Sequence, residues 1–205
     1  MSFSSPLASY RYRSDDSTYA GNLSGTGSLT KTGAGTLTLS GANTYSGGTS
    51  VLGGTVTANG PSVLGTGNVT FANSTALSLG GASIIKLSLG SDSDLSLTGT
   101  TVRVNIASPT QFDSIAGSGL LSSAAFTNST LDFTGSNVSA GSFAIFTSFN
   151  QLSGTLAITG YNSSAFAASY SAGVVTFTAI PEPGIQILLF GALGLAGSRR
   201  RGRPN

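Results

Sequence analysis

Short strands of alternating apolar and hydroxyl residues, interrupted by glycine, recur along the chain and constrain its fold more than any other feature. Between residues 19 and 60, Leu37 and Leu39 alternate with threonine and serine, so one face of the strand is apolar and the other is polar. The paired glycines at 47–48 and 53–54 supply the positive φ that tight corners need. This pattern predicts coils that stack, each burying its aliphatic stripe against its neighbours.

The strand pattern continues beyond residue 60. The segments NVTFA, ALSLG, IIKLSLG, LSLTG and TVRVNI, between residues 68 and 106, are separated by Gly, Asn, Asp and Ser. Only 8% of the 205 residues are charged and 29 are glycine, a composition that disfavours helices, while 39% hydrophobic residues are too many for a disordered chain. The body is therefore expected to be all-β, and a β-sandwich would give similar local signals.

The stretch GAGTLTLSGANTYSGGT, within residues 19–60, resembles the autotransporter-associated β-strand repeat, also called the passenger-associated transport repeat. The resemblance implies a right-handed parallel β-solenoid, or β-helix, on the cell surface, and a motif that serves architecture and export rather than catalysis. We expect Asn43 to close a turn through its side-chain amide, and Tyr45 to pack over a corner rather than stack on a sugar ring. The residues that carry the motif are Gly35, Thr36, Leu37, Leu39, Gly41, Asn43, Tyr45, Gly47 and Gly48.

The composition and the strand pattern of the chain change after about residue 110. Strand-like segments become richer in phenylalanine, and the pairs Leu131/Phe133, Leu156/Ile158 and Val175/Phe177 suggest longer, hairpin-forming strands. We therefore divide the chain into an N-terminal lead-in (1–18), a β-solenoid (19–110), a C-terminal β-rich segment that caps the solenoid (111–179) and a tail (180–205).

The tail differs chemically from the body. A Pro-Glu-Pro motif is followed by an apolar run of about 14 residues, which as a short helix would span roughly 21 Å against a bilayer core of about 30 Å. Terminal arginines can snorkel to cover the shortfall and would remain in the cytoplasm. The tail residues are Pro181, Glu182 and Pro183; Ile185, Ile187, Leu188, Leu189, Phe190, Leu193 and Leu195; and Arg199, Arg200, Arg201 and Arg203.

This three-part tail resembles the PEP-CTERM sorting signal of bacteria with outer membranes. The resemblance implies transient insertion into the inner membrane, removal by an exosortase, which is a membrane-embedded protease, and association with exopolysaccharide. The alternative for the run is a C-terminal helix that packs on the body. A sorting signal presupposes export, yet no apolar signal region is visible at the N-terminus, so we expect the sequence to be truncated there.

Several functions are disfavoured by residues that the chain lacks. It contains no His and no Cys, which excludes Ser-His-Asp and Cys-His catalysis and the usual zinc sites. Four of the nine cations lie in the tail, leaving five against six aspartates in the body. A nearly neutral body without a basic stripe argues against nucleic-acid binding. We expect no cofactor and no metal.

One constellation supports an alternative function. Asp92 and Asp94 could share a Ca²⁺ ion, although we favour a role in capping a turn. With Lys86 and Arg103, which alternate with apolar residues and should point outward, they could imitate the site of a β-helix polysaccharide lyase or hydrolase. That alternative requires all four residues to converge in one groove.

The favoured function is a non-enzymatic, exported protein of the cell surface or extracellular matrix, in which a solenoid stalk is sorted by an exosortase. A second alternative is an adhesin-like autotransporter passenger. That would require a membrane-inserted C-terminal domain, for which residues 111–179 are too short.

Overall fold

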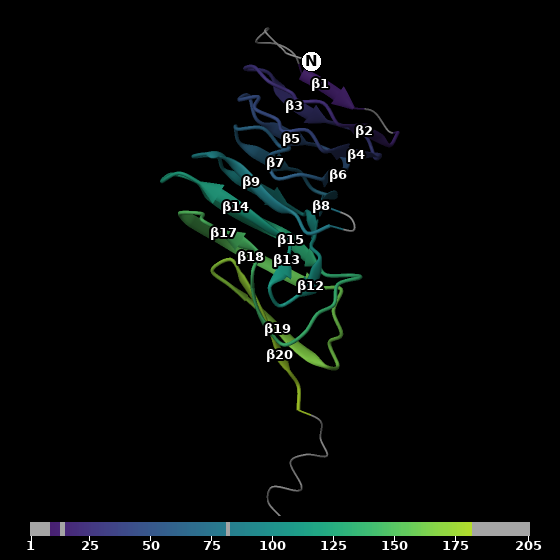
Figure 1. Cartoon of the computed structure of the whole chain (residues 1–205), viewed down its shortest axis with the longest axis vertical. Coiled ribbons are helices and arrows are strands. Elements are labelled where there is room, and N and C mark those ends of the chain that lie inside the picture. The colour runs from purple at the N-terminus through teal and green to yellow at the C-terminus, as the bar shows by residue number, and fades with distance from the viewer. Residues whose placement is uncertain (1–8, 13–14, 81–82, 182–205) are drawn as a thin grey trace, which may run out of the picture.

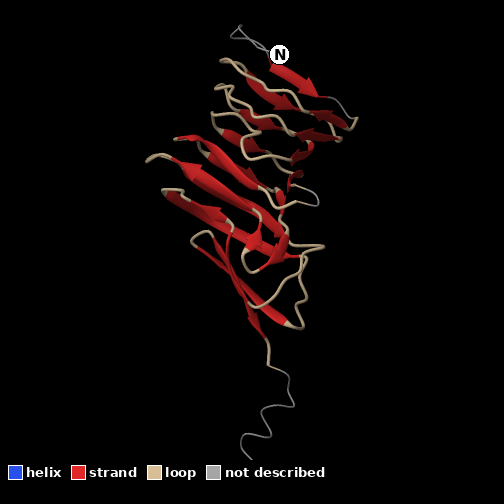
Figure 2. Ribbon diagram, viewed as in Figure 1, coloured by secondary structure: helices blue, strands red, loops and turns tan. Residues whose placement is uncertain are grey.

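The computed structural model of the chain describes residues 9–12, 15–80 and 83–181, and in these ranges it contains strands and turns but no helix (Figures 1 and 2). Most strands pair in parallel and lie one above another, so the chain winds through a stack of coils. The expected all-β parallel solenoid is confirmed for the described residues. The C-terminal hydrophobic helix was expected in the tail, and its residues lie outside these ranges.

Two columns of parallel strands form one sheet of 12 strands. The first column contains β1 (Ser9–Tyr12), β3 (Ser28–Lys31), β5 (Thr49–Val51), β7 (Val69–Phe71) and β10 (Leu95–Thr98). The second column contains β2 (Ser17–Tyr19), β4 (Thr36–Leu39), β6 (Gly54–Ala58), β8 (Thr75–Leu79) and β11 (Thr101–Arg103). Two long strands extend across both columns at the C-terminal end of the sheet, β15 (Ser123–Asp132) and β18 (Gln151–Thr159).

The coils lengthen along the chain. Leu29 pairs with Thr49, 20 residues further on, whereas Leu95 pairs with Ala124, 29 residues further on. Much of the added length forms a third column, which contains β9 (Lys86–Ser91), β14 (Ser114–Ser118) and β17 (Phe146–Thr147). In the earlier coils, loops take the place of this third strand. The solenoid therefore changes from two strands per coil to three.

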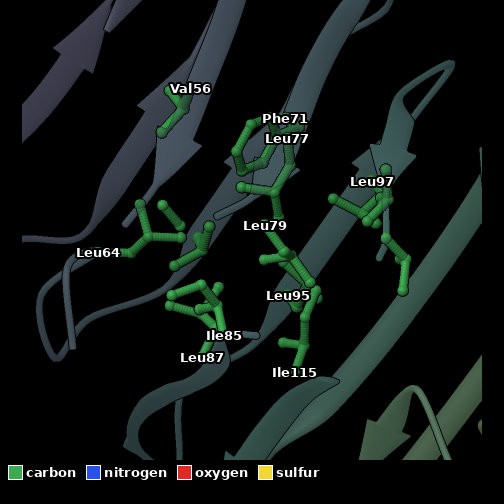
Figure 3. Packing of buried hydrophobic residues seen from close by; sticks show 14 of the residues in the cluster. Val56, Leu64, Phe71, Leu77, Leu79, Ile85, Leu87, Leu95, Leu97 and Ile115 are labelled. Carbon is green, nitrogen blue, oxygen red and sulfur yellow. The ribbon is translucent and has the colours of Figure 1, made fainter. Parts of the chain in front are cut away.

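The core lies inside the stack, where the inward side chain of each strand sits on that of the coil before it. In the second column Leu37, Val56, Leu77, Val102 and Leu131 follow one another in register, and all five are fully buried. Figure 3 shows part of this core, where aliphatic side chains from successive strands meet. Each such side chain stabilises the fold by about 1.5–3 kcal/mol. The predicted apolar stripe is the core of the solenoid.

The parallel stack continues past residue 110, where the sequence predicted a change to hairpins. β15 and β18 pair in parallel, so Leu131 belongs to the stack. A short antiparallel pair, β12 (Ile106–Ser108) and β13 (Gln111–Phe112), interrupts the coil. Antiparallel pairing otherwise occurs in what we call the cap sheet: β16 (Gly141–Ala144), β20 (Val174–Ala179) and β19 (Phe166–Ser171), in that order. The predicted lead-in also contributes to the stack, through β1 and β2.

Aromatic rings hold the cap sheet against the end of the stack. The ring of Phe177 in β20 meets that of Phe133 edge-on, with centroids 5.4 Å apart, and the ring of Phe143 in β16 meets that of Phe112 edge-on, also at 5.4 Å. Tyr170 in β19 packs edge-on against Phe126 of β15. These contacts explain why phenylalanine is enriched in this part of the sequence.

Candidate functional site

Asn43, in the repeat motif, joins three successive coils through its side chain. Its Oδ1 accepts a hydrogen bond from the backbone N–H of Leu23 at 2.8 Å, and its Nδ2 donates to the carbonyl of Val63 at 2.6 Å. These partners lie 20 residues before and 20 residues after Asn43, and Asn43 is 1% exposed. The side chain thus ties one coil to the next, where we had expected it to close a local turn.

Tyr45 fills the inside of the same loop. It is buried, and its Oη lies 2.5 Å from Oγ1 of Thr49, which itself donates to the carbonyl of Leu64 at 2.8 Å. Burial raises the pKa of Tyr45 to about 12, opposed by the hydrogen bond with Thr49. A ring held in this way is part of the interior and presents no face to a sugar.

Glycine is required where the next coil passes over Tyr45. Gly65 has a φ of +74°, and a Cβ at this position would stand 2.6 Å from the Tyr45 ring. At the predicted glycine corners, Gly48 and Gly54 have positive φ as expected, whereas the first glycine of each pair does not. The repeat motif therefore encodes close stacking of coils.

A second set of polar residues lies inside the corner between the two main columns. Thr75, Thr100 and Ser129 occupy this corner in three successive coils, and all are buried. The hydroxyls of Thr75 and Thr100 are 3.3 Å apart, and the N–H of Thr100 donates to Oγ of Ser129 at 3.2 Å. The periodicity of apolar residues did not reveal this ladder, because its members look like ordinary surface hydroxyls in the sequence.

The two candidate calcium ligands instead accept hydrogen bonds from the following coil. Oδ1 of Asp92 accepts from the N–H of Leu121 at 2.9 Å, and Oδ1 of Asp94 accepts from the N–H and the hydroxyl of Ser123 at 3.1 and 2.7 Å. Both aspartates lie at the turn between β9 and β10. Among the described residues, no group of three or more metal-ligating side chains gathers in one place.

The two cations of the proposed lyase site lie away from these aspartates. Lys86 begins β9, and Asp92 follows the end of that strand, so about 20 Å of extended chain separates them. Nζ of Lys86 donates to the carbonyl of Phe112 at 2.5 Å and lies 4.1 Å from the centre of that ring. Nε of Arg103 is 3.9 Å from Oδ2 of Asp132. The convergence that a lyase site would need is absent from these positions.

Two shallow grooves border Arg103 on the outer face of the second column. One, of about 320 Å³, is lined by Ser78, Leu79, Gly80, Arg103, Val104, Asn105, Thr134 and Gly135. The other, of about 400 Å³, is lined by Ala34, Gly54, Thr55, Ser74, Thr75, Ala76, Gly99, Thr101 and Arg103. Neither Asp92 nor Asp94 lines either groove.

Two buried charges were not anticipated from the sequence. Lys31 is 1% exposed, and its Nζ donates to the carbonyls of Gly33 and Gly53 at 3.1 and 3.0 Å. Burial lowers its pKa, opposed by the charge of Asp16. A lysine in a strand is ordinarily assigned to the surface. Lys31 lies two residues after Leu29 in β3, however, so both side chains are on the same, inward face of the strand.

Asp113 is fully buried and organises the loop beside β9. Its two carboxylate oxygens accept the N–H groups of Ile85 and Asn105 at 2.6 and 2.7 Å. Burial raises the pKa of Asp113, opposed by these hydrogen bonds and by Lys86. With both oxygens committed to the backbone, its role in the fold is structural.

Only the start of the predicted sorting motif falls within the described residues. Pro181 is exposed and follows the end of β20. The remaining tail residues that we singled out, from Glu182 to Arg203, lie outside the described ranges. In the part of the chain that the structure describes, no helix has the length and apolar character needed to span a membrane.

The columns of parallel strands, stacked through buried side chains, define a β-solenoid. Within it, residues 29–58 match the family called passenger-associated transport repeat. This segment runs from β3 to β6 and contains Asn43 and Tyr45, two of the side chains buried between coils. The comparison with curated proteins finds no match.

Proposed function

We propose that this protein is a non-enzymatic β-solenoid that is exported to the cell surface or extracellular matrix. The observation that carries the proposal is the location of the repeat motif. Asn43 and Tyr45 are buried between coils, and residues 29–58 match a repeat whose name refers to passenger transport. The parallel fold and this match fit an exported solenoid of the passenger type, whose repeats extend a stalk rather than build a catalytic centre.

In this proposal the tail is the sorting signal. Residues 181–183 are the site recognised by an exosortase, residues 185–195 insert transiently into the inner membrane, and the arginines at 199–203 hold the end in the cytoplasm. Pro181 is exposed after the last strand of the body, which is where a protease needs access. Exopolysaccharide is the proposed partner outside the cell, because the class of sorted proteins implies it.

Intact-mass spectrometry of the gene product from the host envelope and medium tests the sorting step. The expected result is loss of the mass beyond residues 181–183 only in cells that contain the exosortase. Replacing both Pro181 and Pro183 by alanine should block the loss, whereas Pro109→Ala, at an exposed proline of the body, should not. An uncut chain in exosortase-positive cells would refute sorting and leave the fold assignment intact.

The non-enzymatic character is tested separately. The purified chain should release no new reducing ends or unsaturated sugars from host polysaccharide. Turnover that is abolished by Arg103→Ala but not by Lys86→Ala would place a catalytic site in the grooves beside Arg103 and overturn the proposal.

A further inference from the structure

β18 and β19 follow one another like the two arms of a hairpin, but their backbones do not pair. The loop of residues 160–165 connects the end of β18 to the start of β19. The other ends also approach closely, since a Cβ on Gly173 would lie 3.1 Å from the side chain of Leu152. Within the described residues β18 pairs only with β15, and β19 only with β20. The facing edges therefore retain backbone N–H and C=O groups that no neighbouring strand uses.

A groove of about 500 Å³ lies between the two arms. Sites for small molecules commonly have volumes of about 300–1,000 Å³. A peptide strand lying along the two edges would meet the 160–165 loop at one end and the close approach of Leu152 to Gly173 at the other. The groove therefore suits a compact ligand better than an added strand.

The groove combines apolar and hydroxyl side chains. The hydroxyl residues are all exposed, whereas the apolar and aromatic residues are at least partly buried and belong to the core or pack against it. None of the lining residues is charged, so an ionic ligand would find no counter-charge there. The hydroxyl residues are Ser153, Thr155, Ser169 and Ser171, and the apolar and aromatic residues include Leu152, Leu156, Ile158, Tyr161 and Tyr170.

Tyr170 places a buried polar atom in the wall of this groove. Its Oη is shielded from solvent and makes no hydrogen bond of standard geometry to the described residues. Burial raises the pKa of Tyr170 to about 12, opposed by the nearby backbone of Gly173. A buried hydroxyl without a partner is costly, so a ligand that supplies a hydrogen bond here gains affinity.

We propose that this groove binds one or two residues of a neutral saccharide. A neutral sugar has hydroxyls that donate and accept hydrogen bonds, and these match the strand edges and the hydroxyl side chains. It also has apolar C–H faces, which match Tyr161 and the aliphatic side chains. The proposal rests on the proposed function for the source of its ligand, exopolysaccharide outside the cell, and specifies that the bound part is uncharged.

Isothermal titration calorimetry of the purified full chain tests the proposal. The neutral probes are cellobiose, maltose and N,N′-diacetylchitobiose, and at least one should bind with a dissociation constant below about 10 mM. Digalacturonic acid, which is charged, should not bind. Ser169→Phe places a ring in the groove and should weaken binding at least about tenfold. Ser142→Phe is the matched control, because Ser142 is an exposed serine on β16, at the other edge of the cap sheet, and does not line the groove.

Binding by none of the neutral probes, equal binding of digalacturonic acid, or unchanged affinity in Ser169→Phe would each overturn the proposal. Circular dichroism of both variants checks that the fold is retained. Tyr170→Phe keeps the ring but removes the hydroxyl, and it should weaken binding by about three- to tenfold.

Hydrogen exchange gives a second readout. The amides of β18 and β19 that face the groove should gain protection when the sugar is added. Full protection without sugar would show that the arms pair with each other, which would overturn the proposal. These measurements use the purified chain, so their failure leaves the sorting result intact, and an uncut chain in the sorting experiment leaves the groove intact.

Discussion

Replacement of Asn43 by alanine tests whether one side chain holds three coils together. The substitution removes the acceptor for the N–H of Leu23 and the donor for the carbonyl of Val63, both of which are buried. A buried backbone group left without a partner costs about 1–3 kcal/mol, so the two together predict a loss of about 2–6 kcal/mol. The free energy of unfolding of a domain is commonly only about 5–15 kcal/mol, so the hydrogen bonds of Asn43 account for a large share of it.

Urea unfolding followed by far-UV circular dichroism measures this loss, and the melting temperature should fall by roughly 5–20 °C. Asn59→Ala is the matched control, because Asn59 is an exposed asparagine in the following coil and should change stability by less than about 0.5 kcal/mol. If Asn43→Ala is as stable as Asn59→Ala, the bridge does not hold the coils together and the account of the repeat is wrong.

Three further predictions concern backbone strain and pH. Gly65→Ala should destabilise the fold more than Gly135→Ala, because both glycines have positive φ but only Gly65 faces a neighbour, the ring of Tyr45; the difference in unfolding free energy isolates the clash. The pKa of Asp113 is raised above its ordinary 3.8, so folding favours the protonated carboxyl. The free energy of unfolding should therefore fall as the pH rises from about 4 through the folded-state pKa. Urea titrations at successive pH values measure this slope, and Asp113→Asn should remove it. The pKa values of Tyr45 and Tyr170 are raised to about 12, so the unfolded chain loses these protons at lower pH than the folded chain does. The free energy of unfolding should therefore decline between about pH 10 and 12. In an absorbance titration of the folded protein, Tyr45→Phe should remove one of the tyrosines that ionise near pH 12.

The parallel solenoid could be predicted because its signal is local and repeated. Leu37 and Leu39 alternate with hydroxyl residues, glycines mark the corners, and the structure turns these features into an apolar column inside the stack. The predicted strands between residues 68 and 106 correspond to β7–β11. Register along the second column follows directly, since each coil repeats the same pattern.

The polar interior could not be predicted by the same means. Asn43 and Ser129 are buried because a neighbouring coil offers each a hydrogen-bond partner, and that partner lies 20–32 residues away in sequence. Local patterns assign such residues to turns or to the surface. The hairpins expected after residue 110 do form at β20, which contains Val175 and Phe177 and pairs in antiparallel fashion with β19, but β15 and β18 pair in parallel instead. Alternation in β15 is compatible with parallel or antiparallel neighbours, and only the coil before it decides between them.

The change in coil length divides the stack into a part that can grow and a part that cannot. Where the period is 20 residues, a duplicated unit would present the same strands and the same asparagine bridge to both neighbours, so tandem duplication would lengthen the stalk without disturbing either end. Where the period reaches 29 residues, each coil includes a strand of the third column, so an inserted copy of a 20-residue unit would lack that strand and would not fit both of its neighbours. Evolutionary gain and loss of coils is therefore expected in the N-terminal half, whereas the end that contains the cap sheet should keep a fixed number of coils.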